Sequence, residues 1–85
     1  MSDIAKNLIE AAAQSPYDAQ DAWLQASDLP PPPALDWAHA AARGILEDLR
    51  GRSGVGNELE NLDEDVRAEL VESVAHIIRA AHSAG

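Results

Sequence analysis

The longest regular pattern of hydrophobic and polar positions lies in the last third of the chain. Asp63 is a favoured N-cap residue, and the two acids after it place negative charge where the helix dipole favours it. Aliphatic residues then recur at α-helical spacing, with charged residues on the opposite side. The pattern predicts a long amphipathic C-terminal helix over residues 63–82. The aliphatic positions expected to be buried are Val66, Leu70, Val71, Val74, Ile77, Ile78 and Ala81.

Two shorter helices and a linker are predicted before the middle of the chain. A hydrophobic face over residues 2–14 indicates the first helix. Ser15 and Pro16, a favoured N-cap and a favoured first helical residue, indicate a second helix over 16–26. A run of four prolines follows, and prolines hold an extended conformation without donating backbone hydrogen bonds. Residues 27–34 are therefore expected to form a rigid linker.

A further helix is expected from Leu35 or Asp36 to Arg50, where Gly51 can end it. Asn57 can then cap a short turn over residues 58–61. The face of the longer helix that should be buried carries Leu35, Ala38, Ala42, Ile45, Leu46 and Leu49. Its polar side carries His39, Arg43, Glu47 and Arg50, so His39 is expected to face solvent, like His76 on the last helix. Trp37, Ala41 and Gly44 form a strip of small residues beside a large ring, which indicates the close approach of another element or another chain.

No stretch alternates as a strand, so the sequence predicts an all-α fold with one helical domain over residues 1–85. We expect a small antiparallel bundle of four to five helices, in which the C-terminal helix packs against the third and first helices. The 46% hydrophobic fraction contains no Phe and only two Trp, so the core must be thin and rich in Ala. A thin core makes extra burial against a second copy plausible.

Composition narrows the possible functions. The chain has no Cys, which excludes disulfides, thiolate metal sites and cysteine nucleophiles. No apolar run reaches the length of a membrane span, and the N-terminus lacks a signal-peptide pattern, so a cytosolic protein is expected. A net charge of −9 opposes direct binding to nucleic acids or anionic membranes, and it favours attraction to a basic protein surface.

Motifs for catalysis or cofactor binding are incomplete. Gly51 and Gly56 have the spacing of a phosphate-binding loop, but Asn57 stands where its lysine is required. The histidines are not spaced to converge on a metal, and no serine lies in a nucleophile elbow. We therefore expect a non-enzymatic protein without catalytic, cofactor or metal sites.

Residues 58–72 carry most of the chain's excess negative charge, and we call them the acidic segment. Arg67 is the only basic residue in this segment. This concentration is typical either of a solvated helix face or of a surface that attracts a basic partner. The candidate partner-binding residues are Glu58, Glu60, Asp63, Glu64, Asp65, Glu69 and Glu72.

The arginines and one tryptophan are secondary candidates. Arg67 falls inside the apolar stripe of the last helix and needs an acidic partner, either Asp63 one turn back or an acid on another helix. Arg50 and Arg52, with Arg43, form the basic patch of the sequence. That patch has the chemistry to hold a carboxylate or phosphate, and the alternative is an internal salt bridge to the acidic segment. Trp37 marks the apolar strip described above.

One stretch of the chain, from Ile45 to Ala81, resembles a known kind of protein module. It reads Ile-Leu-Glu-Asp-Leu-Arg-Gly-Arg-Ser-Gly-Val-Gly-Asn-Glu-Leu-Glu, followed by Asn-Leu-Asp-Glu-Asp-Val-Arg-Ala-Glu-Leu-Val-Glu-Ser-Val-Ala-His-Ile-Ile-Arg-Ala-Ala. It resembles a module of small acidic helical proteins encoded by phages and prophages. The resemblance covers less than half of the chain and implies a bacterial host cytosol but no site residues. By analogy with anti-CRISPR proteins, it implies an inhibitor of a nucleic-acid-binding host protein.

Two functional hypotheses follow. The first is an acidic protein-binding inhibitor that covers a basic, nucleic-acid-binding surface of a host protein such as a CRISPR effector. The second is a structural or assembly protein that acts as a homodimer or small scaffold through the apolar surface around Trp37, Ala41 and Gly44.

Overall fold

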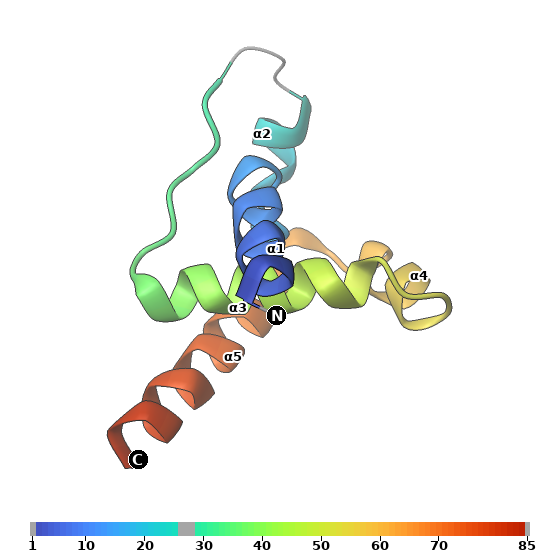
Figure 1. Cartoon of the computed structure of the whole chain (residues 1–85). Helices are drawn as coiled ribbons and strands as arrows, with labels where there is room; N and C mark the ends of the chain where they lie inside the picture. The colour runs from blue at the N-terminus through green and yellow to red at the C-terminus, as the bar shows by residue number, and fades with distance from the viewer. Residues whose placement is uncertain (1, 26–28, 85) are drawn as a thin grey trace.

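The structure, a computed structural model, describes residues 2–25 and 29–84. This part of the chain forms α-helices and no strand (Figure 1). The predicted all-α class with a long C-terminal helix is confirmed. The helices are α1 (Ser2–Gln14), α2 (Asp21–Gln25), α3 (Trp37–Arg50), α4 (Val55–Glu60) and α5 (Glu64–Ala84).

Helix α3 is the element on which the others pack. Its start is fixed by the N-cap Asp36, whose Oδ1 accepts a hydrogen bond from the His39 backbone N–H at 2.9 Å. Gly51 caps its end, as expected. Helices α1, α4 and α5 all pack against α3 (Figure 1). The expectation that α5 also packs substantially on the first helix is wrong, because α1 makes its main contacts with α3.

The approach of α1 to α3 is closest at Gly44. A Cβ atom built at that position would lie 3.0 Å from Cγ1 of Ile9 in α1. The predicted close approach of another element at the Trp37, Ala41 and Gly44 strip is therefore confirmed at its Gly44 end.

The core lies between α3 and α5 and is as thin as the composition predicts. Among the described residues, Val71 is the largest side chain that is completely buried. Leu49, Leu59, Leu70, Val74 and Ile78 pack around the core and are only partly buried. The core itself consists of Tyr17, Ala38, Ala42, Leu46, Val71 and Ala75.

The aliphatic faces predicted for α3 and α5 are only partly buried. Leu35, before α3, is 79% exposed, and Ile77 of α5 is 67% exposed. Ile45, Val66 and Ala81 are also exposed, so these five assignments to the core are wrong. The reason is that α3 and α5 cover each other along one narrow strip, which leaves the neighbouring aliphatic strip open.

The second helix is much shorter than predicted. Residues 16–19 form a turn, closed by a hydrogen bond from the Ala19 N–H to the Pro16 carbonyl oxygen at 3.2 Å, and α2 begins only at Asp21. The ring of Tyr17 is buried, and its hydroxyl donates to the Leu59 carbonyl oxygen at 2.7 Å. This tertiary contact outweighs the local N-cap signal. The predicted end at Ala26 lies outside the described residues.

The predicted short turn over residues 58–61 is replaced by α4, which starts earlier, at Val55, and is followed by its C-cap Asn61. The expectation that Asn57 caps this element is wrong, because Asn57 lies inside the helix. Gly54 permits this start because its φ of 86° lies in the left-handed region. Gly56 is also required, because a Cβ there would overlap the Arg50 carbonyl oxygen.

The predicted linker carries no regular secondary structure over residues 29–34, and residues 27 and 28 lie outside the described part. Two of its carbonyl groups are held by the helices. The Trp23 indole Nε1 donates to the Pro30 carbonyl oxygen at 2.9 Å, and Arg43 Nη1 donates to that of Pro32 at 2.9 Å. The linker is thereby attached to α2 and α3.

Candidate protein-binding surface

The seven candidate acids lie on α4, on the turn after it and on the first half of α5. Three of them have internal partners. Oε1 of Glu60 accepts a hydrogen bond from Arg50 Nε at 3.1 Å, and Oε2 of Glu64 accepts the Asp21 backbone N–H at 2.6 Å. Glu72 contacts the imidazoles of His39 and His76 at 2.7 and 2.8 Å. These three carboxylates therefore stabilise the fold.

The other four carboxylates are exposed, and none forms an ion pair with a described residue. Their charge is consequently available to an external partner. One of them also has a local role, because Oδ1 of Asp65 accepts the Val66 backbone N–H at 3.0 Å. The four residues are Glu58, Asp63, Asp65 and Glu69.

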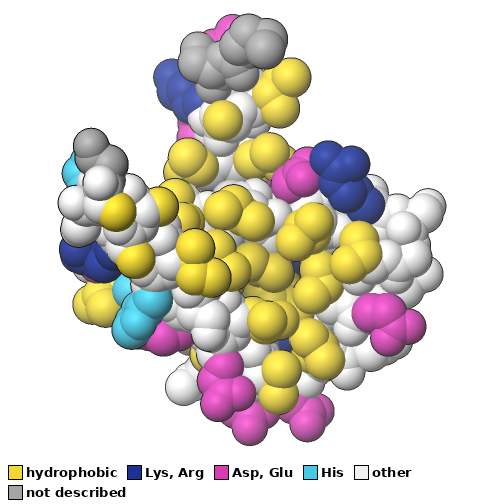
Figure 2. All heavy atoms as spheres, turned by 90° about the horizontal axis from the view of Figure 1, so that it is seen from below, with side chains coloured by type: hydrophobic (Ala, Val, Ile, Leu, Met, Phe, Trp, Pro, Cys, Tyr) yellow, Lys and Arg dark blue, Asp and Glu magenta, His cyan; other side chains and the backbone are white. Residues whose placement is uncertain are grey.

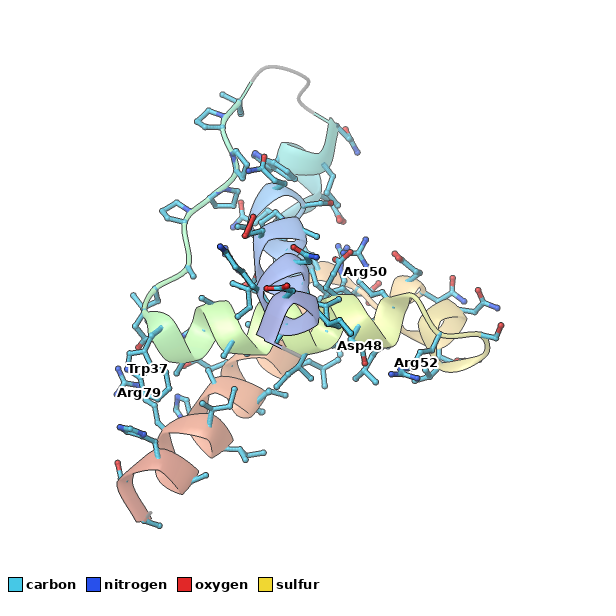
Figure 3. The ribbon with its side chains drawn as sticks, in the orientation of Figure 1. Trp37, Asp48, Arg50, Arg52 and Arg79 are labelled. Carbon is cyan, nitrogen blue, oxygen red and sulfur yellow. The ribbon has the colours of Figure 1, made fainter. Side chains whose placement is uncertain are left out.

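The five arginines do not form a free basic patch. Each pairs with a carboxylate of the same chain, and most of these carboxylates lie outside the acidic segment. Figure 3 shows Asp48, Arg50 and Arg52 at one end of α3 and Trp37 with Arg79 at the other. The predicted internal salt bridge to the acidic segment is found for Arg50, which pairs with Glu60, whereas Arg43 and Arg52 pair with acids outside that segment. The pairs are Arg43–Asp18, Arg50–Glu47, Arg50–Glu60, Arg52–Asp48, Arg67–Asp21 and Arg79–Asp36.

Arg67 lies in the apolar stripe, as predicted, and is only 9% exposed. Its Nη2 pairs with Asp21 of α2, and so the partner is an acid on another helix rather than Asp63. Its guanidinium carbon lies 6.0 Å from the centre of the Tyr17 ring. Its Nε is buried without a hydrogen-bond partner, which is a cost to stability.

The expectation that His39 faces solvent is wrong, because it is buried between α3 and α5 at 7% exposure. Its Nδ1 lies 2.8 Å from Asp36 Oδ1, and its Nε2 lies 2.7 Å from Glu72 Oε2. Hydrogen bonds to the two carboxylates raise the pKa of His39 and lower the pKa values of Asp36 and Glu72. With both ring nitrogens facing carboxylates, the protonated imidazolium is the form that donates to both.

His39 was missed because sequence periodicity shows which residues share a face but not what covers that face. The available signal was local. Asp36 and His39 have the i, i+3 spacing of an N-cap and the residue that it caps, which places their side chains close together. The contact with Glu72 joins residues on two helices and leaves no trace in one sequence.

Trp37 is half exposed at the start of α3. Its ring meets the His82 ring edge-on with centroids 5.1 Å apart, and the Arg79 guanidinium carbon lies 5.7 Å from its centre. Trp37 therefore attaches the C-terminal half of α5 to α3, while leaving part of its surface free.

Hydrophobic side chains gather in a broad patch on the face seen from below, with acidic side chains along part of its border (Figure 2). A groove of about 330 Å³ lies between α1 and α3. The groove residues are Ala5, Leu8, Ile9, Ala41, Gly44, Ile45 and Asp48, so the predicted apolar surface includes α1 as well as the strip on α3.

Within residues 2–25 and 29–84, no group of three or more His, Asp or Glu side chains has a metal-binding arrangement. In the same part of the chain, none of the helices combines the length and the apolar character required to cross a bilayer. Comparisons with protein-family models, with curated proteins and with solved structures found no match for this chain.

Proposed function

We propose that the protein is a non-enzymatic binding protein that covers a basic surface of a host protein. It does so with Glu58, Asp63, Asp65 and Glu69 on α4, the start of α5 and the turn between them, which we call the acidic edge. A surface that normally holds nucleic acid, such as that of a CRISPR effector in a bacterial cytosol, has the required charge. The protein would then act as a competitive inhibitor of nucleic-acid binding.

The distribution of internal ion pairs carries this proposal. The five arginines pair mainly with Asp18, Asp21, Asp36, Glu47 and Asp48, all of which precede the acidic segment. The fold thus neutralises acids elsewhere and leaves Glu58, Asp63, Asp65 and Glu69 without a cation among the described residues. Concentrated, uncompensated charge of one sign steers an oppositely charged partner and sets its orientation.

Charge complementarity speeds the association of two proteins and makes it specific, but it adds little to affinity. Tight binding of a partner therefore also needs an apolar contact. Val55 supplies one, since it is exposed on α4 three residues before Glu58 and therefore lies on the same side of the helix. A basic partner that also buries Val55 gains hydrophobic stabilisation that added salt does not screen.

The test compares two double variants of equal charge change. Asp65→Asn with Glu69→Gln removes two carboxylates of the acidic edge. Asp3→Asn with Glu10→Gln removes two exposed carboxylates of α1 and is the matched control, because Asp3 and Asp65 both lie in the first turn of a long helix. The measurement is the binding of labelled target DNA by purified CRISPR effector complexes at several salt concentrations, with each protein added as competitor.

We expect the wild type and the control to reduce DNA binding, the edge variant to do so much less, and all effects to weaken with added salt. Equal inhibition by the edge variant and the control would remove the acidic edge from the proposal. No inhibition of any complex by the wild type would remove CRISPR effectors as the partner.

A further inference from the structure

The conformation of the linker is fixed by its own chemistry. A proline ring sets φ at about −65°, and the residue before a proline is held in the β or polyproline region. Each of residues 29–32 precedes a proline. The linker therefore has the polyproline conformation with about three residues per turn, and Figure 1 shows it as an extended path that leads into α3.

The exposure of the prolines follows this period of three. Pro30 and Pro33 lie on the same row of the polyproline helix, and both are exposed. Pro31 and Ala34 form the next row, and both are half buried. Leu29, beside the first row, is 57% exposed. The linker thus turns one row toward the helices and presents the other, Pro30 and Pro33, which we call the outer row.

The protein itself shows how this segment is held by an aromatic side chain. The Trp23 indole donates to the Pro30 carbonyl oxygen, and Trp23, Pro30 and Pro32 line one pocket. Proline rings beside an aromatic ring, together with carbonyl groups as acceptors, are the features by which aromatic-lined grooves recognise polyproline segments. Because prolines have no N–H, no partner can add a β-strand along this segment.

The same kinds of groups remain available on the linker. The rings of the outer row are exposed, and no described residue donates a hydrogen bond to the carbonyl groups of Pro31 and Pro33. The bonds from Trp23 and Arg43 hold the segment in place before any partner arrives. Binding to it therefore costs less conformational entropy than binding to a flexible chain.

We propose that the outer row is a second protein-binding surface, which docks into a groove of a partner protein lined by aromatic side chains and hydrogen-bond donors. The proline rings pack on the aromatic rings of the groove, and the carbonyl groups accept from its donors. This surface belongs to other elements than the acidic edge, so it does not rest on the proposed function.

A second copy of this chain does not offer such a groove. The chain has only three aromatic residues. The ring of Tyr17 is buried, and Trp23 is already bonded to the linker of its own chain. Trp37 is half exposed, but its ring packs against Arg79 and His82, and one ring does not form a groove. The partner is therefore a different protein.

The test uses two purified domains with aromatic-lined polyproline grooves, a WW domain and an EVH1 domain, as probes. Each is titrated into the whole isotope-labelled chain. Chemical shifts of the backbone amides of Leu29, Ala34 and Leu35 report binding, because the prolines between them have no N–H. We expect saturable shifts at these amides with at least one probe. No saturable shift with either probe would overturn the proposal and leave the segment a rigid linker only.

Two double variants locate the bound face. Pro30→Ala with Pro33→Ala removes the outer row, and we expect it to lower the affinity for the probe about tenfold or more. Pro31→Ala with Pro32→Ala removes two half-buried prolines and is the matched control, because it costs the segment the same number of prolines and keeps the carbonyl group that Arg43 binds. We expect the control to bind within about threefold of the wild type, with unchanged helicity in both variants. Equal losses in the two variants would overturn the assignment to the outer row.

The edge variant of the previous section separates the two proposals. Asp65→Asn with Glu69→Gln leaves the linker unchanged, so it should bind the probe as the wild type does, whatever its effect on DNA binding by the effector. Weakened probe binding in this variant would overturn the independence of the two surfaces.

Discussion

The buried arginine of α5 gives a prediction that runs against the usual view of ion pairs. Arg67 is almost buried, whereas the side chain of its partner Asp21 is 59% exposed. Replacing Arg67 by Met keeps an unbranched side chain of similar reach against Tyr17 and removes the unpartnered Nε. We expect Arg67→Met to leave the free energy of unfolding almost unchanged or slightly higher.

The magnitude follows from the contacts that are lost and the cost that is removed. A pair with a largely exposed carboxylate contributes no more than about 1 kcal/mol, and the contact with the Tyr17 ring contributes about 0.5–1 kcal/mol. A buried donor without a partner costs about 1–3 kcal/mol. These terms nearly cancel, so the predicted net change lies within about 1 kcal/mol of zero. Arg67→Ala should instead cost about 2 kcal/mol, because it also removes the packing of the aliphatic stem.

A double-mutant cycle tests whether Arg67→Met is tolerated because it removes a buried charge or because the site tolerates any substitution. Asp21→Ala leaves a buried guanidinium without its counter-ion and should cost about 1.5 kcal/mol in the wild type. In the Arg67→Met background the same substitution should cost about 0.5 kcal/mol or less, because no buried charge remains. Urea unfolding followed by helical circular dichroism measures all four proteins. A loss of more than about 2 kcal/mol in Arg67→Met, or equal costs of Asp21→Ala in both backgrounds, would refute the reasoning.

Two further predictions concern other parts of the fold. Gly56→Ala should lower the melting temperature by at least about 4 °C, because its Cβ overlaps the Arg50 carbonyl oxygen, whereas Gly51→Ala should have a small effect because it meets only ordinary contacts. The stability that His39 gains from its two carboxylates is complete below about pH 6.5 and is lost as the pH rises through its raised pKa, so stability should fall above that pH. His39→Gln should abolish this alkaline loss, and an unchanged pH profile in that variant would contradict the assignment.

The parts of the fold that sequence predicts well are those in which local signals agree. In α3, the N-cap Asp36 and the terminating Gly51 lie at the ends of a regular apolar pattern, and the observed bounds follow them. The start of α5 directly after Asp63 has the same origin. Each of these boundaries depends on residues within one or two turns of it, which a single sequence displays in full.

The parts that sequence predicts poorly depend on contacts between distant residues. The local signals at Ser15 and Pro16 favour a helix, but Tyr17 reaches Leu59, forty-two positions away, and holds a turn instead. His39 becomes buried only because Glu72 arrives from α5. Neither contact has a local signature. Local sequence signals therefore assign residues 16–26 to a helix and place His39 on the surface.

The candidate surface likewise has features that the sequence shows and features that only the structure shows. The sequence shows that acids are concentrated between Glu58 and Glu72, but it does not show which of them the fold itself uses. Glu60, Glu64 and Glu72 hold helices together, and only the structure separates them from the remaining four. For this reason the edge variant above changes Asp65 and Glu69, whose replacement breaks no ion pair in the described part of the chain.

The thin core and the uneven charge have a common physical consequence. Alanine packing at the α3–α5 contact brings the helices together but buries few large side chains, so ion pairs that link separate helices, such as Arg67–Asp21 and His39–Glu72, supply part of the cohesion. All five arginines pair with carboxylates of the chain, which has far more acids than bases. The acids that remain must therefore face outward. The composition that limits the core therefore also leaves Glu58, Asp63, Asp65 and Glu69 exposed on α4, α5 and the turn between them.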